Sequence, residues 1–133
     1  SSLVKAGMKN IVMRSSVLSM SNFSEANIEH GDLSHSDAHG SVFVDTKLID
    51  AQFIKSNLRQ SNFMNADLSN TNFSSADLSG TDFTGAKLIN TNFFNADLRY
   101  SNLRHAKILN INIDKAVLCK TKLPWGVRND NCK

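Results

Sequence analysis

An apolar side chain recurs at every fifth residue from Leu3 to Leu123, and this period constrains the fold more than any other feature of the sequence. Of these 25 positions, 24 hold Leu, Ile, Met or Phe, and Ala38 is the sole exception. A period of five matches neither an amphipathic helix, with 3.6 residues per turn, nor a half-buried strand, with a period of two. It predicts a chain that turns a corner after every five residues, so that one position of each repeat always points inward.

The residues before each central position support this interpretation. Two residues before it stands Ala, Ser, Thr or Gly, except at Ile11 and Ile111, and the residue between is usually Asn or Asp. We expect the small residue to face inward where a larger side chain would collide with the next wall. Four five-residue sides would close a square coil, and successive coils would pair as parallel strands do, about 4.8 Å apart.

Phenylalanine and leucine would then stack in separate columns. Residues twenty apart fall in one column, which places the aromatic rings on two opposite walls and leucine on the other two. The phenylalanine columns are Phe23, Phe43, Phe63, Phe83 and Phe53, Phe73, Phe93. Such a core keeps one cross-section from coil to coil, as close packing requires, and its end coils need caps.

Several repeats match a known motif. Residues 66–69 and 76–79 read ADLS, and residues 96–99 read ADLR. The pattern resembles the pentapeptide repeat family, whose motif is A(D/N)LXX, and the resemblance covers residues 21–123. It implies an all-β fold, a right-handed quadrilateral parallel β-helix of about six twenty-residue coils.

The two ends of the chain depart from the repeat. Residues 1–20 keep the apolar centres but carry Gly7, Val12 and Val17 where Asn or Asp is usual, which indicates either a degenerate first coil or an N-terminal cap. Residues 124–133 are expected to form a C-terminal capping tail. Pro124 removes a backbone donor and stops the ladder, and Trp125 is expected to lie over the open end of the core.

The cysteine pair bears on the compartment. Cys119 and Cys132 both lie near the C-terminus, and a disulfide between them would suit an oxidising compartment, whereas two free thiols would suit a reducing one. Some exported members of the family end in similar tails with Cys and Pro-Trp-Gly, so the resemblance favours the periplasm, a lumen or secretion. No apolar run is long enough to predict a membrane span.

Nothing in the sequence predicts catalysis. There is no nucleophile–base constellation, glycine-rich phosphate loop or CxxC pair, so we expect no enzyme and no cofactor. Residues 28–41, IEHGDLSHSDAHGS, have the composition of a metal site. However, Asp32 and Asp37 fill the ordinary Asn/Asp position, and ligands around the outside of a coil diverge. Because zinc needs its ligands about 2 Å from one centre, we expect no metal here.

Outward-facing apolar side chains are the candidate functional residues. They form short columns, which predict a contact surface for a second copy or for another protein; alternatively, they lie flat and shield the backbone. The columns are Ile49, Ile89 and Leu109; Ile54 and Phe94; and Val44 and Met64.

Charge limits the alternatives. The chain has a net charge of +3, and the last third is rich in Lys and Arg without interleaved aromatic residues, so nucleic acid is not an expected partner. Some pentapeptide repeat proteins protect DNA gyrase as acidic mimics of DNA, and the basic balance disfavours that function. A piece of a secreted bacterial effector is another alternative. The leading hypothesis is a non-catalytic scaffold that binds an unknown protein partner, with a homodimer as one form of that contact.

Overall fold

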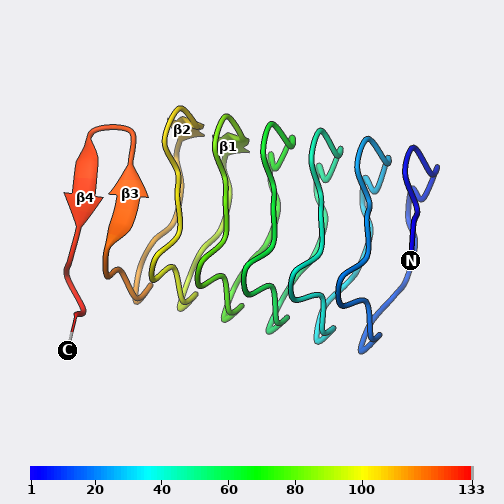
Figure 1. The fold of residues 1–133 in the computed structure, drawn as a ribbon, viewed down its shortest axis with the longest axis horizontal. Coiled ribbons are helices and arrows are strands. Elements are labelled where there is room, and N and C mark those ends of the chain that lie inside the picture. Colours follow the sequence, from blue (N-terminus) through cyan, green and yellow to red (C-terminus); the bar gives the residue numbers. More distant parts are fainter. Residues whose placement is uncertain (133) are drawn as a thin grey trace.

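Backbone pairing repeats every twenty residues along the chain. In the computed structural model, which describes residues 1–132, parallel bridges join residues twenty apart, from Ser2 with Asn22 to Asn102 with Lys122. Figure 1 shows the resulting coils side by side from the N-terminus to the C-terminus. The described residues contain no helix, and therefore none that could cross a membrane. The chain is a β-helix whose turns follow the five-residue period.

Four short strands are long enough to be named. Strands β1 (Lys87–Ile89) and β2 (Lys107–Leu109) are parallel neighbours in successive coils. Strands β3 (Thr121–Leu123) and β4 (Gly126–Arg128) form an antiparallel hairpin at the C-terminal end. We call the stretch around each central apolar residue a wall and name it by that residue.

One hydrogen-bonding pattern builds every wall. The N–H of a central residue donates to a carbonyl of the next coil, as from Phe23 to Val42 at 2.7 Å. The N–H two residues later donates in the same direction, and the residue before the centre donates back to the preceding coil. Each wall therefore presents two donors towards the C-terminal end of the rod for every one that it presents towards the N-terminal end.

The core matches the column arrangement expected from the sequence. Rings within each phenylalanine column stack nearly parallel, with centroids 4.7 Å apart for Phe43 and Phe63 and 5.4 Å apart for Phe73 and Phe93. Rings of the two columns meet edge to face, as Phe43 and Phe53 do at 5.7 Å. Both arrangements are favourable for aromatic pairs, so the rings form one continuous stack along the rod.

The small residue of each repeat has a second role when it is Ser or Thr. Its buried hydroxyl donates to the central carbonyl 23 residues earlier, as from Thr46 to Phe23 at 2.8 Å and from Thr71 to Leu48 at 2.7 Å. No buried side-chain N or O atom among the described residues lacks a partner. Since an unpaired buried hydroxyl is destabilising, these bonds explain why the position accepts polar as well as apolar small residues.

Asn and Asp precede the centre because their side chains fold the turn. The Oδ1 atom accepts the N–H two residues on, as Asn62 does from Met64 at 2.9 Å and Asp82 from Thr84 at 2.9 Å. This local bond is the usual way in which Asn and Asp stabilise a turn. Gly7, Val12 and Val17 lack such an acceptor, yet each still pairs with the residue twenty positions later.

The corner residue, at numbers ending in 0 or 5, adopts a left-handed backbone conformation. All positive-φ residues other than Gly126 occupy this position, including His30 at 59°, His35 at 61° and Lys55 at 56°. Asn, Asp and His tolerate this region better than other non-glycine residues. The corner geometry thus accounts for two of the histidines in residues 28–41.

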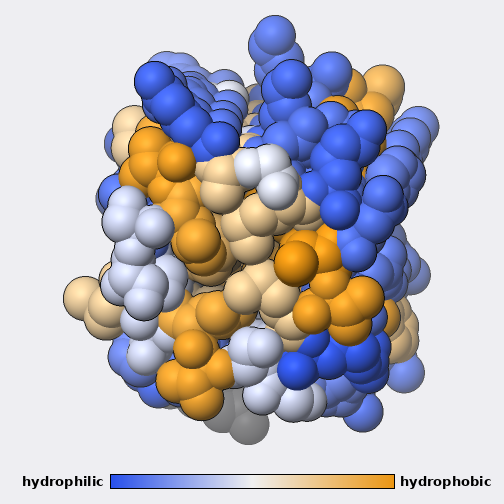
Figure 2. Space-filling model, turned by 90° about the vertical axis from the view of Figure 1, so that its right-hand side faces the viewer, coloured by the Kyte–Doolittle hydropathy of each residue, from blue (hydrophilic) through white to orange (hydrophobic). Residues whose placement is uncertain are grey.

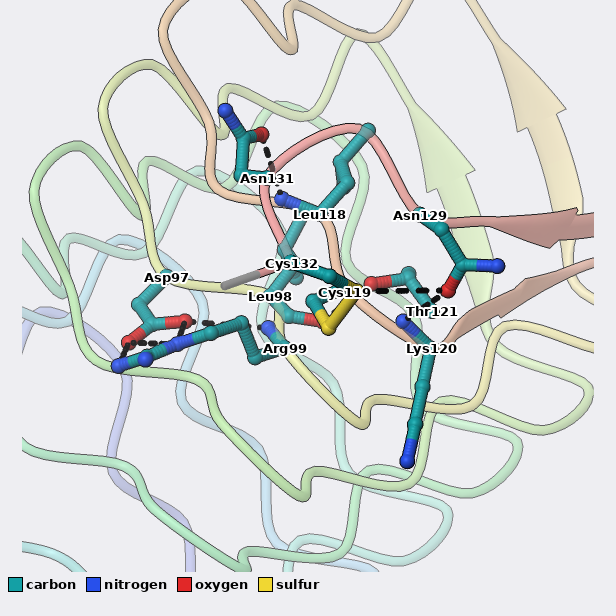
Figure 3. The surroundings of a disulfide bond; sticks show 10 residues. All are labelled: Asp97, Leu98, Arg99, Leu118, Cys119, Lys120, Thr121, Asn129, Asn131 and Cys132. Carbon is teal, nitrogen blue, oxygen red and sulfur yellow. Dashed lines mark hydrogen bonds and ion pairs between the residues drawn. A yellow bond between two sulfur atoms is a disulfide. The ribbon is translucent and has the colours of Figure 1, made fainter.

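Residues 1–132 cover only part of the C-terminal end. Strand β4 pairs with β3 over the Leu123 wall. The side-chain oxygens of Asn131 and Asn129 accept the N–H groups of Leu118 and Lys120, at 3.1 and 2.8 Å, in place of carbonyls from a further coil. A disulfide joins Cys119 to Cys132, with the Cα atoms 4.9 Å apart, and fastens this segment (Figure 3).

Trp125 does not lie over the core as we expected. It sits between β3 and β4 at the turn of the hairpin, and 68% of its surface is exposed. The hairpin reverses at Pro124 and Trp125, so the indole is carried away from the core, and the described residues that cover the end are those of β4 and the tail.

Ala38 provides a test of core packing. It is fully buried in the column that holds Leu18 and Leu58, and the regular backbone places its Cβ where those leucines have theirs. We expect Ala38→Leu to raise the free energy of unfolding by about 2 kcal/mol, the reverse of a typical Leu→Ala change. The measurement is thermal and urea unfolding, with Leu58→Ala as a destabilising comparison. A lower stability of Ala38→Leu would show that neighbouring side chains already fill the space.

The disulfide should hold the tail against the Leu118 wall. In a Cys119→Ser, Cys132→Ser variant, we expect the amides of Leu118 and Lys120 to exchange with solvent at least about tenfold faster, because opening of the tail no longer works against a closed loop. Amides of the central coils should be unchanged, since each coil depends mainly on its neighbours. Hydrogen exchange followed by NMR makes the measurement, and unchanged exchange at Leu118 would contradict it.

Candidate interaction surface

The first apolar column is continuous only near the C-terminal end. Ile89 of β1 and Leu109 of β2 are directly paired, so their side chains are neighbours on the outer face. Leu109 is 57% exposed, whereas Ile89 and Ile49 are half-buried. Ser69 separates Ile49 from the other two. The exposed apolar surface of this column is therefore concentrated at Leu109.

The second column lies on the next wall of the coil. Phe94 is 37% exposed, and the Lys115 ammonium lies 5.7 Å from the centre of its ring, within range of a cation–π contact. Ile54 is half-buried, with Ser74 between it and Phe94. Leu109 and Phe94 are thus the two exposed members of the predicted set.

Val44 and Met64 form the third column and are both half-buried. They belong to a different wall from the other two columns, so the structure distributes the seven predicted residues over three walls. It does not bring them into one patch.

Other exposed apolar residues were not anticipated. They are Val4, Val12, Val17, Met20, Tyr100, Trp125 and Val127. At the N-terminal end, the central residues of the first coil are only partly buried, and Figure 2 shows apolar surface in the middle of that end with polar surface around it. The valines at positions 12 and 17, where Asn or Asp is usual, were the sequence signal for this apolar end.

Arginine and aspartate alternate along another face. Arg99 binds Asp97 through two nitrogens, Nε at 2.9 Å and Nη2 at 2.6 Å, while Nε of Arg59 lies 3.9 Å from Asp77. Burial raises the pKa of Asp97, but the hydrogen bonds from Arg99 outweigh it, so that the pKa lies below its ordinary value. A hollow of about 350 Å³ opens over Gly80 between the two arginines. Since both guanidinium groups have carboxylate neighbours, this hollow is not a free anion site.

Charge is segregated along the rod. Residues 21–100 hold ten acidic and five basic side chains, whereas residues 1–20 hold three basic and none acidic. Residues 101–132 hold six basic and two acidic side chains, and Lys133 lies outside the described residues. The net charge of +3 therefore combines an acidic middle with two basic ends.

The histidines and aspartates of residues 28–41 form separate pairs. Nδ1 of His39 lies 2.9 Å from Asp37, Nδ1 of His30 lies 3.5 Å from Asp50 in the next coil, and Asp32 binds Arg14 at 2.9 Å. The hydrogen bond from His39 holds the pKa of Asp37 below its usual range. Among residues 1–132, no three His, Cys, Asp or Glu side chains gather as metal ligands would.

Solved structures are similar to this chain. HetL from the cyanobacterium Nostoc sp. strain PCC 7120, a pentapeptide repeat protein involved in the regulation of heterocyst differentiation, matches with a TM-score of 0.69 and 23% identity over 96% of this chain and 64% of HetL. Rfr23 from Cyanothece 51142 matches with a TM-score of 0.33 and 22% identity, covering 71% of this chain and 58% of that protein. A thylakoid lumen protein of Arabidopsis thaliana matches with a TM-score of 0.35 and 24% identity, covering 84% of this chain and 70% of that one.

No curated protein sequence is significantly similar to the chain. The likeness to HetL shows the fold, and this chain spans less than two thirds of that protein, 64% of its length. The family model of pentapeptide repeats matches eight copies, in segments 21–60, 46–85, 61–99 and 76–110. The matched repeats carry the same walls and corners described above, and the chain is a member of the pentapeptide repeat family.

Proposed function

We propose that this protein is a non-catalytic scaffold that binds another protein through its side walls. The observation that carries the proposal is the pair of exposed apolar side chains on adjoining walls, Leu109 and Phe94, at the C-terminal end of the rod. Large exposed apolar side chains on neighbouring walls of a rod can mark a contact surface. The rigid ladder beneath them fixes their spacing, as a preorganised binding surface requires.

For the architecture, we propose a right-handed helix of about six coils. In this division, residues 1–20 are the first coil, residues 21–123 the regular repeat and residues 124–133 the capping tail. The bridges between residues twenty apart support it. We also propose that the protein works in an oxidising compartment, because a disulfide that fastens the last coil persists where thiols are not kept reduced.

The side-wall surface can be tested by adding charge to it. We expect Leu109→Glu, Phe94→Glu to reduce capture of partner protein from a native extract at least about tenfold, because two carboxylates would have to be desolvated in the contact. Bound proteins are quantified by mass spectrometry, and the mass of the free protein in native solution reports a homodimer.

The matched control is Ser19→Glu, Ser24→Glu, which adds the same two charges at the same position of the repeat, directly after a central residue, but at least three coils from the exposed pair. It should leave capture within about twofold, as expected for surface changes outside a contact. Equal loss in both variants would show that net charge, and not the apolar pair, governs capture. No specific capture by the unmodified protein would overturn the proposal.

A further inference from the structure

Within the described part of the chain, two of the four walls at the C-terminal end of the rod are covered. Strand β4 covers the Leu123 wall, and the segment with Asn129, Asn131 and Cys132 covers the Leu118 wall. The chain reverses at Pro124, and no backbone group among residues 1–132 pairs with the outer side of the Ile108 and Ile113 walls. We call these two walls, residues 104–115, the open edge.

The open edge presents backbone donors. In the preceding coil, the N–H groups of Phe93 and Asn95 donate to Asn112 and Asp114, at 2.8 and 2.9 Å. The equivalent N–H groups of the last coil point beyond the rod and have no partner among residues 1–132; they belong to Ile108, Asn110, Ile113 and Lys115. An unpaired strand edge is a template for pairing with another chain, and a donor-rich one selects carbonyl groups.

The open edge is also apolar. Ile108, Ile111 and Ile113 are only half-buried, whereas Leu88 and Phe93, which occupy the equivalent central positions one coil earlier, are fully buried. A hollow of about 450 Å³ lies beside the edge, lined by Arg104, His105 and residues of the β3–β4 hairpin. One further layer of chain over these walls would bury the three isoleucines and fill the hollow.

The charges around the open edge indicate what that layer contains. Arg104, Lys107 and Lys115 border it, and none of them lies within 4.0 Å of a carboxylate among residues 1–132. Asp114 is the only acidic residue between Asp97 and Asp130. Complementarity of charge therefore favours a segment with carboxylates.

A second copy of this chain does not fit the charges. The first coil holds Lys5, Lys9 and Arg14 and no acidic residue of its own; Lys5 and Arg14 pair with carboxylates of the second coil. Stacking this coil on the open edge would still bring two coils of net positive charge together. Two C-terminal ends would meet with the same repulsion. Repulsion between like charges disfavours both arrangements of two copies.

We propose that the open edge binds an extended acidic segment of a partner protein by strand addition, with its carbonyls on the four free N–H groups and its carboxylates near Lys107 and Lys115. Strand addition to an exposed edge draws its affinity from main-chain hydrogen bonds and its specificity from side chains. The inference rests on the proposed scaffold role and deepens it, but it uses the end of the rod instead of the Leu109 and Phe94 side surface.

The probe is a labelled peptide with an N-terminal Asp followed by two acidic repeat-like units, acetyl-DADLEGADLEG-amide. The matched probe replaces every Asp and Glu by Lys. Fluorescence anisotropy measures binding to the full chain, and hydrogen exchange by NMR reports the amides of Ile108, Asn110, Ile113 and Lys115. We expect the acidic peptide to bind and to slow exchange at these four amides, and the lysine peptide to do neither.

The variant Lys107→Glu, Lys115→Glu should weaken binding of the acidic peptide about tenfold or more, since two attractive contacts become repulsive. The matched control is Lys47→Glu, Lys55→Glu, which makes the same change in the same two columns three coils earlier, where the ladder N–H groups are already bonded. It should bind within about twofold of the unmodified protein at moderate salt, because three coil spacings of about 4.8 Å exceed the screening length.

Equal weakening by both variants, or binding that leaves the four amides unprotected, would overturn the proposal. So would a homodimer in which these amides are already protected, which would assign the edge to a second copy. If the unmodified protein fails to bind the acidic peptide but still captures partner protein from extract, the edge proposal is refuted and the side-wall function still stands.

Discussion

The hydrogen bond from one coil to the next is the interaction on which the rest of the structure depends. Each wall is only a few residues long, and apart from one bond across each corner its backbone groups find their partners in the coils before and after it. The ladder fixes the coil spacing at which phenylalanine rings stack and at which a buried hydroxyl reaches the carbonyl 23 residues earlier. Core packing and polar satisfaction are thus consequences of one repeated bond. Stability in such a molecule is a sum over neighbours, so it weakens towards an end that nothing covers.

Much of the fold could be predicted from the sequence because every level of the repeat carries the same information. The centres at every fifth residue, the small residue two before and the Asn or Asp between them all indicate one geometry, and the stacked phenylalanine columns follow from it. The position of Asp50 beside His30 follows from the same register. The pairing of Cys119 with Cys132 was one of two interpretations, and the structure shows the disulfide.

The ends and the surface could not be predicted in the same way because no repeat governs them. Trp125 was expected on the core, but it is part of the hairpin turn with Pro124, between β3 and β4, and is exposed to solvent. Asn129 and Asn131 accept hydrogen bonds from Lys120 and Leu118 in place of the carbonyls of a further coil. These bonds depend on the path of the tail after the hairpin, which the five-residue repeat does not determine. Likewise, the sequence gives the columns of apolar residues, but only the structure shows that Leu109 and Phe94 are exposed while the remaining five are half-buried.

The left-handed corners allow the surface of the rod to change while the fold stays the same. Corner residues of the rod include Lys, Glu, Gln, Met, Tyr and His as well as Asn and Gly, and all adopt nearly the same φ. A left-handed conformation is unfavourable for most of these side chains, so the ladder imposes it, and the local sequence does not. A mutation at a corner can therefore change the chemistry of the surface while the coil beneath it keeps its shape. Such a rod can acquire a new binding partner by corner substitutions alone, and a later change to Gly or Asn at an unused corner can restore the stability lost on the way.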